Sequence, residues 1–222
     1  MISKNVFNFL EALKNHNNRE WFKSNISTFR TVESEVKNFY SHLYDQLNQS
    51  DSIDNFKVFR IYRDVRFSKN KTPYKTYFSG SFHRTKPELR GGYYLHLAPN
   101  NESFIATGFW NPDKEDLMRL RKEFEINADE FRAIVEEPRF KANWGSLTGD
   151  ELKYSPRGFA KKHPNIDLIR KKQFIFKKGY TDNEVLSDQF LQEVIYSFMV
   201  IRPYFDYMSS ILTKNLNGEP IL

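Results

Sequence analysis

The chain contains no cysteine. Disulfides, thiolate zinc ribbons and a cysteine nucleophile are therefore excluded together. The chain also lacks an apolar run near the ~20 residues that cross a bilayer, and its first residues lack the apolar core and cleavage site of a signal peptide. We therefore expect a cytoplasmic protein that does not enter a membrane.

Several common functional motifs are missing as well. The sequence has no Gly-x-x-x-x-Gly-Lys-Ser/Thr loop, no Gly-x-Gly-x-x-Gly after an expected strand and no Gly-x-Ser-x-Gly turn. These absences argue against a P-loop, a dinucleotide fold and an α/β-hydrolase. No two histidines have the helical spacing of a zinc site. We expect no metal and no cofactor.

What is present indicates a folded α+β protein. With 222 residues, 39% of them hydrophobic and 16% aromatic, the chain can bury a substantial core. No repeat, low-complexity tract or linker divides it. We expect one domain over residues 1–222.

The periodicity of apolar residues divides this domain into three parts. Residues 1–50 carry apolar side chains at steps of three and four, which predicts helices; one helix after the turn at 16–18 has a stripe from Phe22 through Ile26 to Leu47. The period changes to two over 56–110, which predicts strands near 56–67, 75–84, 91–98 and 103–110. Residues 111–222 predict further helices, a long loop at 138–163, a strand at 173–178 and C-terminal helices. The expected fold is an antiparallel sheet of four to five strands flanked by N-terminal, middle and C-terminal helices.

The net charge of +6 is distributed unevenly. Residues 57–90 contain ten Lys or Arg and two acidic residues, and residues 153–178 contain nine and one, so each segment carries +8. The rest of the chain is acidic, at −10. This polarisation predicts an electropositive face or cleft if the fold brings the two segments together, and two solvated surfaces if it does not.

The densest cluster is at residues 60–75, where six cations accompany one carboxylate. If residues 58–67 form a strand, Arg60, Asp64 and Arg66 share its polar face and Arg63 falls on the apolar face. A buried guanidinium needs compensation, so Arg63 either pairs with a buried carboxylate, reaches a cleft or marks a bulge. The polar loop at 68–73 offers N–H and ammonium groups to a phosphate. The candidate anion-binding residues are Arg60, Arg63, Arg66, Lys69, Lys71, Tyr74 and Lys75, and the candidates for proton transfer are Asp64, Tyr74 and His96.

Several motifs together resemble a known family. They are Arg60-x-x-Arg63-Asp64-x-Arg66-Phe67 followed by Asn70-Lys71-x-x-Tyr74, with Asn18-Arg19-Glu20-Trp21-Phe22, Gly91-Gly92-Tyr93-Tyr94-Leu95-His96 and Gly108-Phe109-Trp110. Over nearly its whole length the chain is similar to the bacterial and fungal family catalogued as domain of unknown function 2461. The resemblance implies candidate positions and no activity. Members of that family often carry an acidic residue before a His-Pro pair, where this chain has Lys162-His163-Pro164. This departure weakens any proposal that the loop binds a metal.

Three functions are compatible with these patterns. The first is binding of a phosphate-bearing ligand, nucleic acid before a small anion, through residues 60–75. The second is an enzyme for a small phosphorylated or carboxylated substrate, with the arginines as an anion clamp. The third is an interaction module in which arginines and carboxylates form a buried network. A concave site favours a small ligand, a flat basic surface favours nucleic acid, and pairing with carboxylates favours the network.

Overall fold

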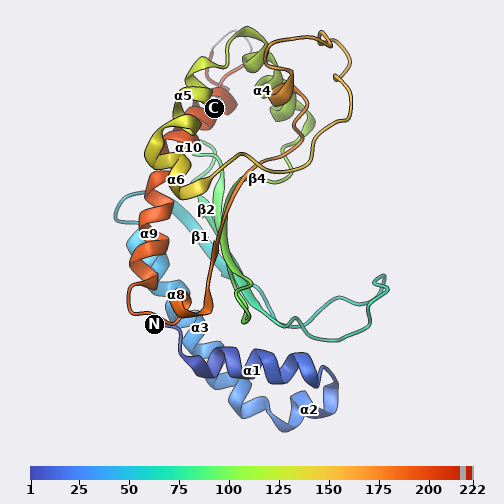
Figure 1. Ribbon diagram of the computed structural model, residues 1–222, viewed down its shortest axis with the longest axis vertical. Coiled ribbons are helices and arrows are strands. Elements are labelled where there is room, and N and C mark those ends of the chain that lie inside the picture. Colours follow the sequence, from blue (N-terminus) through green and yellow to red (C-terminus); the bar gives the residue numbers. More distant parts are fainter. Residues whose placement is uncertain (216–218, 222) are drawn as a thin grey trace. The chain divides into compact units, whose positions relative to one another are not determined.

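A five-stranded antiparallel sheet organises the protein, with helices before, between and after its strands. The computed structural model describes residues 1–215 and 219–221. The strand order is β1-β2-β3-β4-β5, so each strand pairs with its neighbours in the chain. The strands are Ile53–Val58 (β1), Phe78–Arg84 (β2), Gly92–Leu97 (β3), Ser103–Phe109 (β4) and Phe174–Tyr180 (β5) (Figure 1). The predicted α+β class is confirmed.

The helices lie largely where the apolar periodicity predicts them. They are Lys4–Asn15 (α1), Arg19–Ser24 (α2), Ile26–Leu47 (α3), Lys114–Ile126 (α4), Asp129–Glu136 (α5), Pro138–Trp144 (α6), Ile166–Ile169 (α7), Asp182–Val185 (α8), Phe190–Val200 (α9) and Arg202–Leu212 (α10). The expectation for 111–222 extends over residues 216–218 and 222, which lie outside the described part of the chain.

Helix boundaries differ from the predictions at residues 25 and 138. The helix expected after residue 18 is divided at Asn25, whose side-chain amide donates to the carbonyl oxygen of Trp21 at 2.9 Å and so competes with the helical backbone. The loop expected from 138 instead begins with α6. Pro138 occupies its first turn, and the Glu137 carboxylate accepts from the Phe140 N–H at 2.7 Å. A proline at this position starts a helix rather than ending one.

The chain divides into two compact units. Unit 1 comprises residues 1–82, 94–105 and 179–196, and unit 2 comprises 83–93, 106–178 and 197–222. Strands β2 to β5 each contribute residues to both units. The expectation of a single domain stays a prediction.

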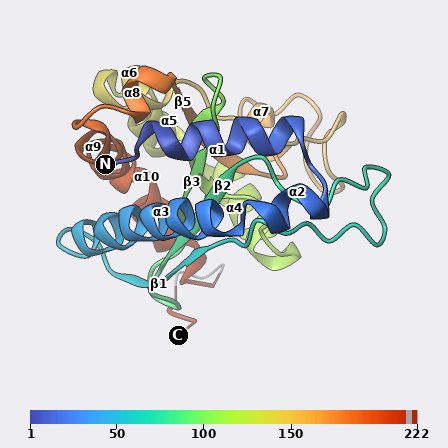
Figure 2. The same cartoon turned by 90° about the horizontal axis from the view of Figure 1, so that it is seen from below.

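The core of unit 1 is built on the apolar stripe of α3, which lies alongside α1 (Figure 2). The Tyr40 ring of α3 stacks on Phe82 of β2 with centroids 5.7 Å apart, and its hydroxyl donates to the carbonyl oxygen of Leu95 at 2.8 Å. A Cβ at Gly80 would lie 2.5 Å from the Tyr40 ring and 2.6 Å from the carbonyl oxygen of Lys57. Only glycine allows this helix to approach β2 so closely.

Unit 2 contains a set of ion pairs, each with at least one buried partner, which we call the arginine network. Arg84, only 1% exposed, donates to Asp206 at 2.9 Å, and its guanidinium lies over the Phe205 ring. Arg90 pairs with Asp116, which is 6% exposed at its side chain and also accepts from Arg119 at 3.1 Å. The interaction-module hypothesis predicts a network of arginines and carboxylates. The arginines of the pairs described here lie outside residues 60–75.

Candidate functional site

The basic segment at 60–75 belongs to a long connection between β1 and β2, not to a strand. β1 ends at Val58, so the strand predicted over 56–67 is wrong beyond that residue. Pairing is limited to an isolated bridge between Tyr62 and Tyr74, with backbone hydrogen bonds on either side. Pro73 has no N–H to donate, so it interrupts a ladder that alternation alone predicts. Figure 1 shows the connection extending away from β1 and β2.

Contacts with the N-terminal helices hold the inner end of this connection. The Asn17 side chain donates to the carbonyl oxygen of Tyr74 at 3.0 Å and accepts from its N–H at 3.1 Å. The Tyr74 ring stacks on Phe22 of α2 with centroids 4.0 Å apart and is only 6% exposed. Burial raises the pKa of Tyr74, so its phenol stays protonated. Tyr74 therefore anchors the connection to α2.

Arg63 is half-buried and has no carboxylate partner in the described part of the chain. Its backbone N–H donates to the carbonyl oxygen of Pro73 at 2.9 Å, and its Nη1 donates to the Thr72 hydroxyl at 2.5 Å. That hydroxyl donates to Oδ1 of Asn70 at 2.8 Å. This chain of hydrogen bonds fixes the guanidinium while leaving its charge unneutralised.

Asp64 and Arg66 form an exposed bidentate pair. Arg66 donates through Nε to Oδ1 at 3.0 Å and through Nη2 to Oδ2 at 2.7 Å. The bonds from Arg66 lower the pKa of the Asp64 carboxyl, and the charge of Arg60 lowers it further. Asp64 is therefore ionised near neutral pH, as the sequence predicts for a carboxylate among arginines. Such a carboxylate makes a poor general acid.

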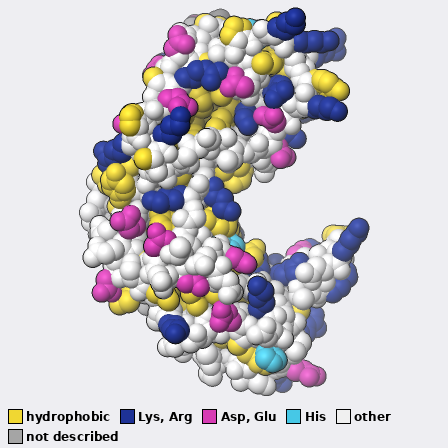
Figure 3. Space-filling model, in the orientation of Figure 1, with side chains coloured by type: hydrophobic (Ala, Val, Ile, Leu, Met, Phe, Trp, Pro, Cys, Tyr) yellow, Lys and Arg dark blue, Asp and Glu magenta, His cyan; other side chains and the backbone are white. Residues whose placement is uncertain are grey.

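The outer part of the connection presents cations to solvent. Arg60, Arg66, Lys69 and Lys71 are all exposed, and Phe67 is 97% exposed. Figure 3 shows dark-blue Lys and Arg side chains gathered on this extension. In the strand predicted over 58–67, Phe67 would share the apolar face with Arg63. It faces solvent because the strand has already ended.

A pocket of about 540 Å³ lies between the connection and the end of α1. Of the predicted residues, Arg63, Asp64, Tyr74 and Lys75 line it, whereas Arg60, Arg66, Lys69 and Lys71 do not. The other lining residues are Lys14, Asn17, Asn70, Thr72, Thr76 and Tyr77. Sequence reasoning missed Lys14 and Asn17, because neither lies near the basic cluster in the chain. The motif at 18–22, which directly follows them, was the only available signal.

The charge of this pocket is positive. Lys14, Arg63 and Lys75 line it without a carboxylate partner in the part of the chain that the structure describes. The one acidic lining residue, Asp64, is already paired with Arg66. Burial lowers the pKa of the Lys75 ammonium, and the nearby charge of Arg60 lowers it further. An anion would relieve the repulsion among these cations.

His96, the third candidate for proton transfer, does not line the pocket. Its ring lies 4.2 Å from that of Tyr77 and 4.6 Å from that of Phe104, and its Nδ1 lies 3.2 Å from the Tyr94 hydroxyl. Tyr77 does line the pocket, so His96 contacts a residue of its wall without lining it. The His96 ring packs among aromatic rings.

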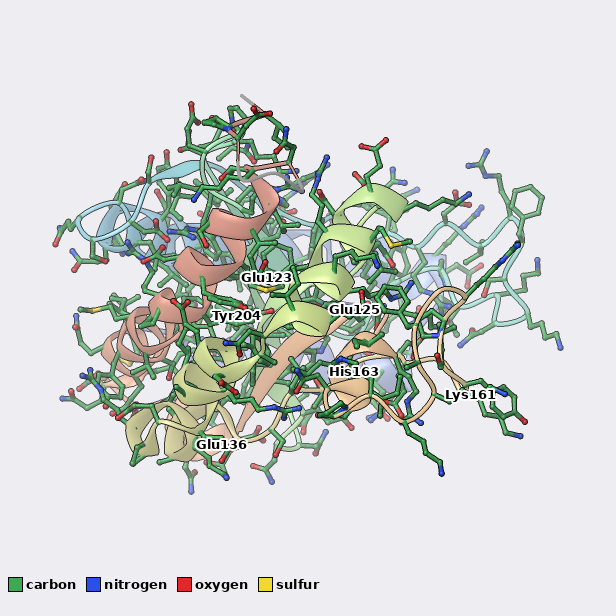
Figure 4. The ribbon with its side chains drawn as sticks, turned by 90° about the horizontal axis from the view of Figure 1, so that it is seen from above. Glu123, Glu125, Glu136, Lys161, His163 and Tyr204 are labelled. Atoms are coloured by element: carbon green, nitrogen blue, oxygen red, sulfur yellow. The ribbon has the colours of Figure 1, made fainter. Side chains whose placement is uncertain are left out.

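The second basic segment, at 153–178, lies in unit 2 and is partly neutralised there. Arg170 and Lys171 pair with Glu151 at 2.9 and 3.0 Å, and the bond from Lys171 lowers the pKa of the Glu151 carboxyl. Figure 4 shows His163 beside α7 and Lys161 farther out along the loop. The positive charges of Arg170 and Lys171 are therefore balanced by a carboxylate of the same unit.

Within residues 1–215 and 219–221, no group of three or more His, Asp or Glu side chains is arranged to hold a metal ion. Over the same residues, no helix combines the length and apolar character needed to cross a membrane.

The fold and the site define an α+β protein with a cationic pocket beside the β1–β2 connection. A family model described as "Conserved hypothetical protein (DUF2461)" matches residues 5–207. The chain belongs to this family, which confirms the resemblance seen in its motifs. No curated protein and no solved structure matches the chain.

Proposed function

We propose that the protein binds a small molecule bearing a phosphate or carboxylate group in the pocket beside the β1–β2 connection. The observation that supports this function is the convergence of Lys14, Arg63 and Lys75 on one concavity without carboxylate partners among the described residues. Cations arranged in this way favour an anion, and a guanidinium offers a carboxylate or phosphate two parallel hydrogen bonds.

The dimensions and the polar lining of the pocket suit such a ligand. A volume of about 540 Å³ lies in the ordinary range for small-molecule sites. Thr72 and Asn70 hold Arg63 before any ligand arrives, which reduces the entropy lost on binding. Tyr77 provides an aromatic wall on which an apolar part of the ligand can pack. An enzyme acting on a small anionic substrate would use the same features.

A second candidate function is nucleic-acid binding, which the sequence favoured first. Phe67 is 97% exposed beside the exposed cations Arg66 and Lys69. An exposed aromatic ring among cations suits base stacking and backbone contact by a single strand. The small ligand takes precedence because a concavity is formed, whereas Phe67 is a single exposed ring.

Titration with inorganic phosphate, a nucleoside monophosphate and a short single strand tests both functions. Followed by amide NMR, the small anions should shift signals from Lys14, Asn17, Thr72 and residues 74–77. Arg63→Gln should weaken binding at least about tenfold. Lys57→Gln, which removes an exposed cation outside the pocket, is the matched control. Equal weakening by both variants would overturn the pocket assignment.

Salt dependence separates the two functions. Single-strand binding should fall with a log–log slope of about −0.7 for each phosphate contacted. Binding of inorganic phosphate at Arg63 should persist in Phe67→Ala, because Phe67 does not line the pocket. Loss of strand binding alone in Phe67→Ala would identify the exposed extension as the nucleic-acid contact.

A further inference from the structure

Lys75 differs from the other lysines of the basic segment in its surroundings. It is half-buried, whereas Lys69 and Lys71 are exposed. Its backbone N–H donates to the carbonyl oxygen of Ile61 at 2.8 Å, which fixes its position beside Tyr74. Its side chain then lines the pocket. The protein therefore holds Lys75 at a defined position in the concavity, which Lys14 also lines.

The surroundings of the Lys75 ammonium favour the neutral amine. Its Nζ lies 5.7 Å from the ring centroid of Phe59 and 5.8 Å from that of Tyr77, and it has no hydrogen bond or ion pair within the described residues. Those distances are at the outer limit of a cation–π contact, so the rings compensate the charge only weakly. Burial and the charge of Arg60 both lower the pKa of the ammonium.

The charged groups nearby act mainly in the same direction. Lys14 and Arg63 line the same pocket as cations, and Arg60 adds a third positive charge. Asp64 is the opposing group, and its carboxylate is bonded to Arg66. Desolvation and neighbouring cations are the two conditions under which lysine becomes a nucleophile in proteins.

We propose that Lys75 is a nucleophilic amine that forms an imine with a carbonyl compound bearing a phosphate or carboxylate group. The inference rests on the proposed function, because Lys14 and Arg63 bind the anionic group and so bring the carbonyl carbon to Nζ. The Nζ lone pair attacks that carbon, and a carbinolamine forms. The carbonyl oxygen then leaves as water with both amine protons, and a carbon–nitrogen double bond remains.

Pyridoxal 5′-phosphate, used purely as a chemical probe, carries both an aldehyde and a phosphate. The full chain is mixed with one equivalent of the probe, reduced with borohydride and digested, and the labelled lysines are identified by mass spectrometry. We expect Lys75 to carry at least about ten times the label of the exposed Lys71. Label spread evenly over Lys69, Lys71 and Lys57 would overturn the inference.

Two variants refine the experiment. Lys75→Arg keeps the positive charge and should abolish the preferred label, with circular dichroism confirming that it folds. Arg60→Gln removes a cation outside the pocket lining, raises the pKa of Lys75 and should slow labelling a few-fold at neutral pH. The wild-type labelling pattern tests the inference even if a variant does not fold.

Pyridoxal without phosphate distinguishes failure of the inference from failure of the proposed function. Equal labelling of Lys75 by both aldehydes would show a reactive lysine and contradict the anion pocket. Saturable binding of the phosphorylated probe, competed by inorganic phosphate but with no label at Lys75, would support the pocket and overturn imine formation. Selective labelling of Lys75 by the phosphorylated probe, with loss of that labelling in Arg63→Gln, supports both the anion pocket and imine formation.

Discussion

Arg63 of unit 1 and the arginines of the network in unit 2 have very different partners. In the arginine network of unit 2, Arg84 pairs with Asp206 and Arg90 pairs with Asp116. In unit 1, Arg63 has a hydroxyl partner instead of a carboxylate within the described residues. A cluster of cations in a sequence can therefore be paired or unpaired in the folded protein. Which of the two occurs depends on whether the fold brings carboxylates from elsewhere in the chain into contact with it. A paired cluster becomes part of the fold, because removing one partner leaves a charge uncompensated, whereas an unpaired cluster keeps its charge for a ligand.

Removing a carboxylate from each region tests the contrast between paired and unpaired arginines directly. Asp206→Asn removes the carboxylate that accepts from the buried Arg84 and should lower the free energy of unfolding by about 2–3 kcal/mol, which is less than for a fully buried pair because Asp206 is itself 58% exposed. Urea denaturation measures the change. The matched variant Asp64→Asn breaks an exposed pair and should leave the urea midpoint unchanged. Equal destabilisation by both variants would contradict the contrast.

Removing a cation from the pocket should not destabilise the protein, in contrast to removing Asp206. Lys14→Gln relieves repulsion among unpaired charges, so the melting temperature should stay the same or rise slightly. The affinity for inorganic phosphate should fall roughly three- to tenfold, because one attractive charge is lost. Calorimetric titration and thermal denaturation of the same sample measure the two effects. A lower melting temperature with unchanged affinity would assign Lys14 a structural role.

The exposed tip of the connection should contribute little to stability. Phe67 is 97% exposed, so Phe67→Ala should change the free energy of unfolding by less than about 0.5 kcal/mol. Thermal denaturation checks this value. Phe22→Ala is the contrasting variant, because Phe22 is only 2% exposed and supports Tyr74; it should cost about 3–5 kcal/mol. A strongly destabilised Phe67→Ala would show that the tip packs against another surface.

The smallest expected effect concerns protonation of the exposed pair. Because Arg66 lowers the pKa of Asp64, the contribution of the pair is complete above the unfolded carboxyl pKa of about 3.9 and is lost as the pH falls through the folded pKa. Arg66→Gln should raise the Asp64 pKa towards that reference value. A carboxyl-detected NMR titration of both proteins measures the shift. An unchanged pKa would show that Arg66 is not the main cause.

Local patterns were sufficient for most of the fold. Steps of three and four placed the buried stripe of α3, and alternation located β2, β3 and β4. These signals reflect which face of an element is buried, and each is contained in a short window of sequence. The failure over 59–67 has the same origin. The apolar and polar residues continue to alternate there, but a strand also needs a neighbouring strand to which it can hydrogen-bond. Pro73, on the opposite side, has no N–H to donate, so the pairing is limited to the Tyr62–Tyr74 bridge.

The candidate site was predicted only in part, because a pocket combines residues that are distant in the chain. Arg63, Asp64, Tyr74 and Lys75 were identified from their own cluster. Lys14 belongs to a helix that ends well before that cluster, and no charge pattern connects the two. The sequence also could not tell which cations find carboxylates, since Asp206 lies 122 residues from Arg84.

The two hydrogen bonds between the Asn17 side chain and the Tyr74 backbone make the pocket dependent on the N-terminal helices. Opening of the turn that carries Asn17 would release Tyr74 and separate Lys14 from Lys75. A ligand held by the closed form must therefore stabilise that turn by mass action, as any ligand stabilises the state that binds it. Hydrogen exchange at the Tyr74 amide would then report occupancy of the pocket, and its slowing would give the affinity without knowledge of any reaction.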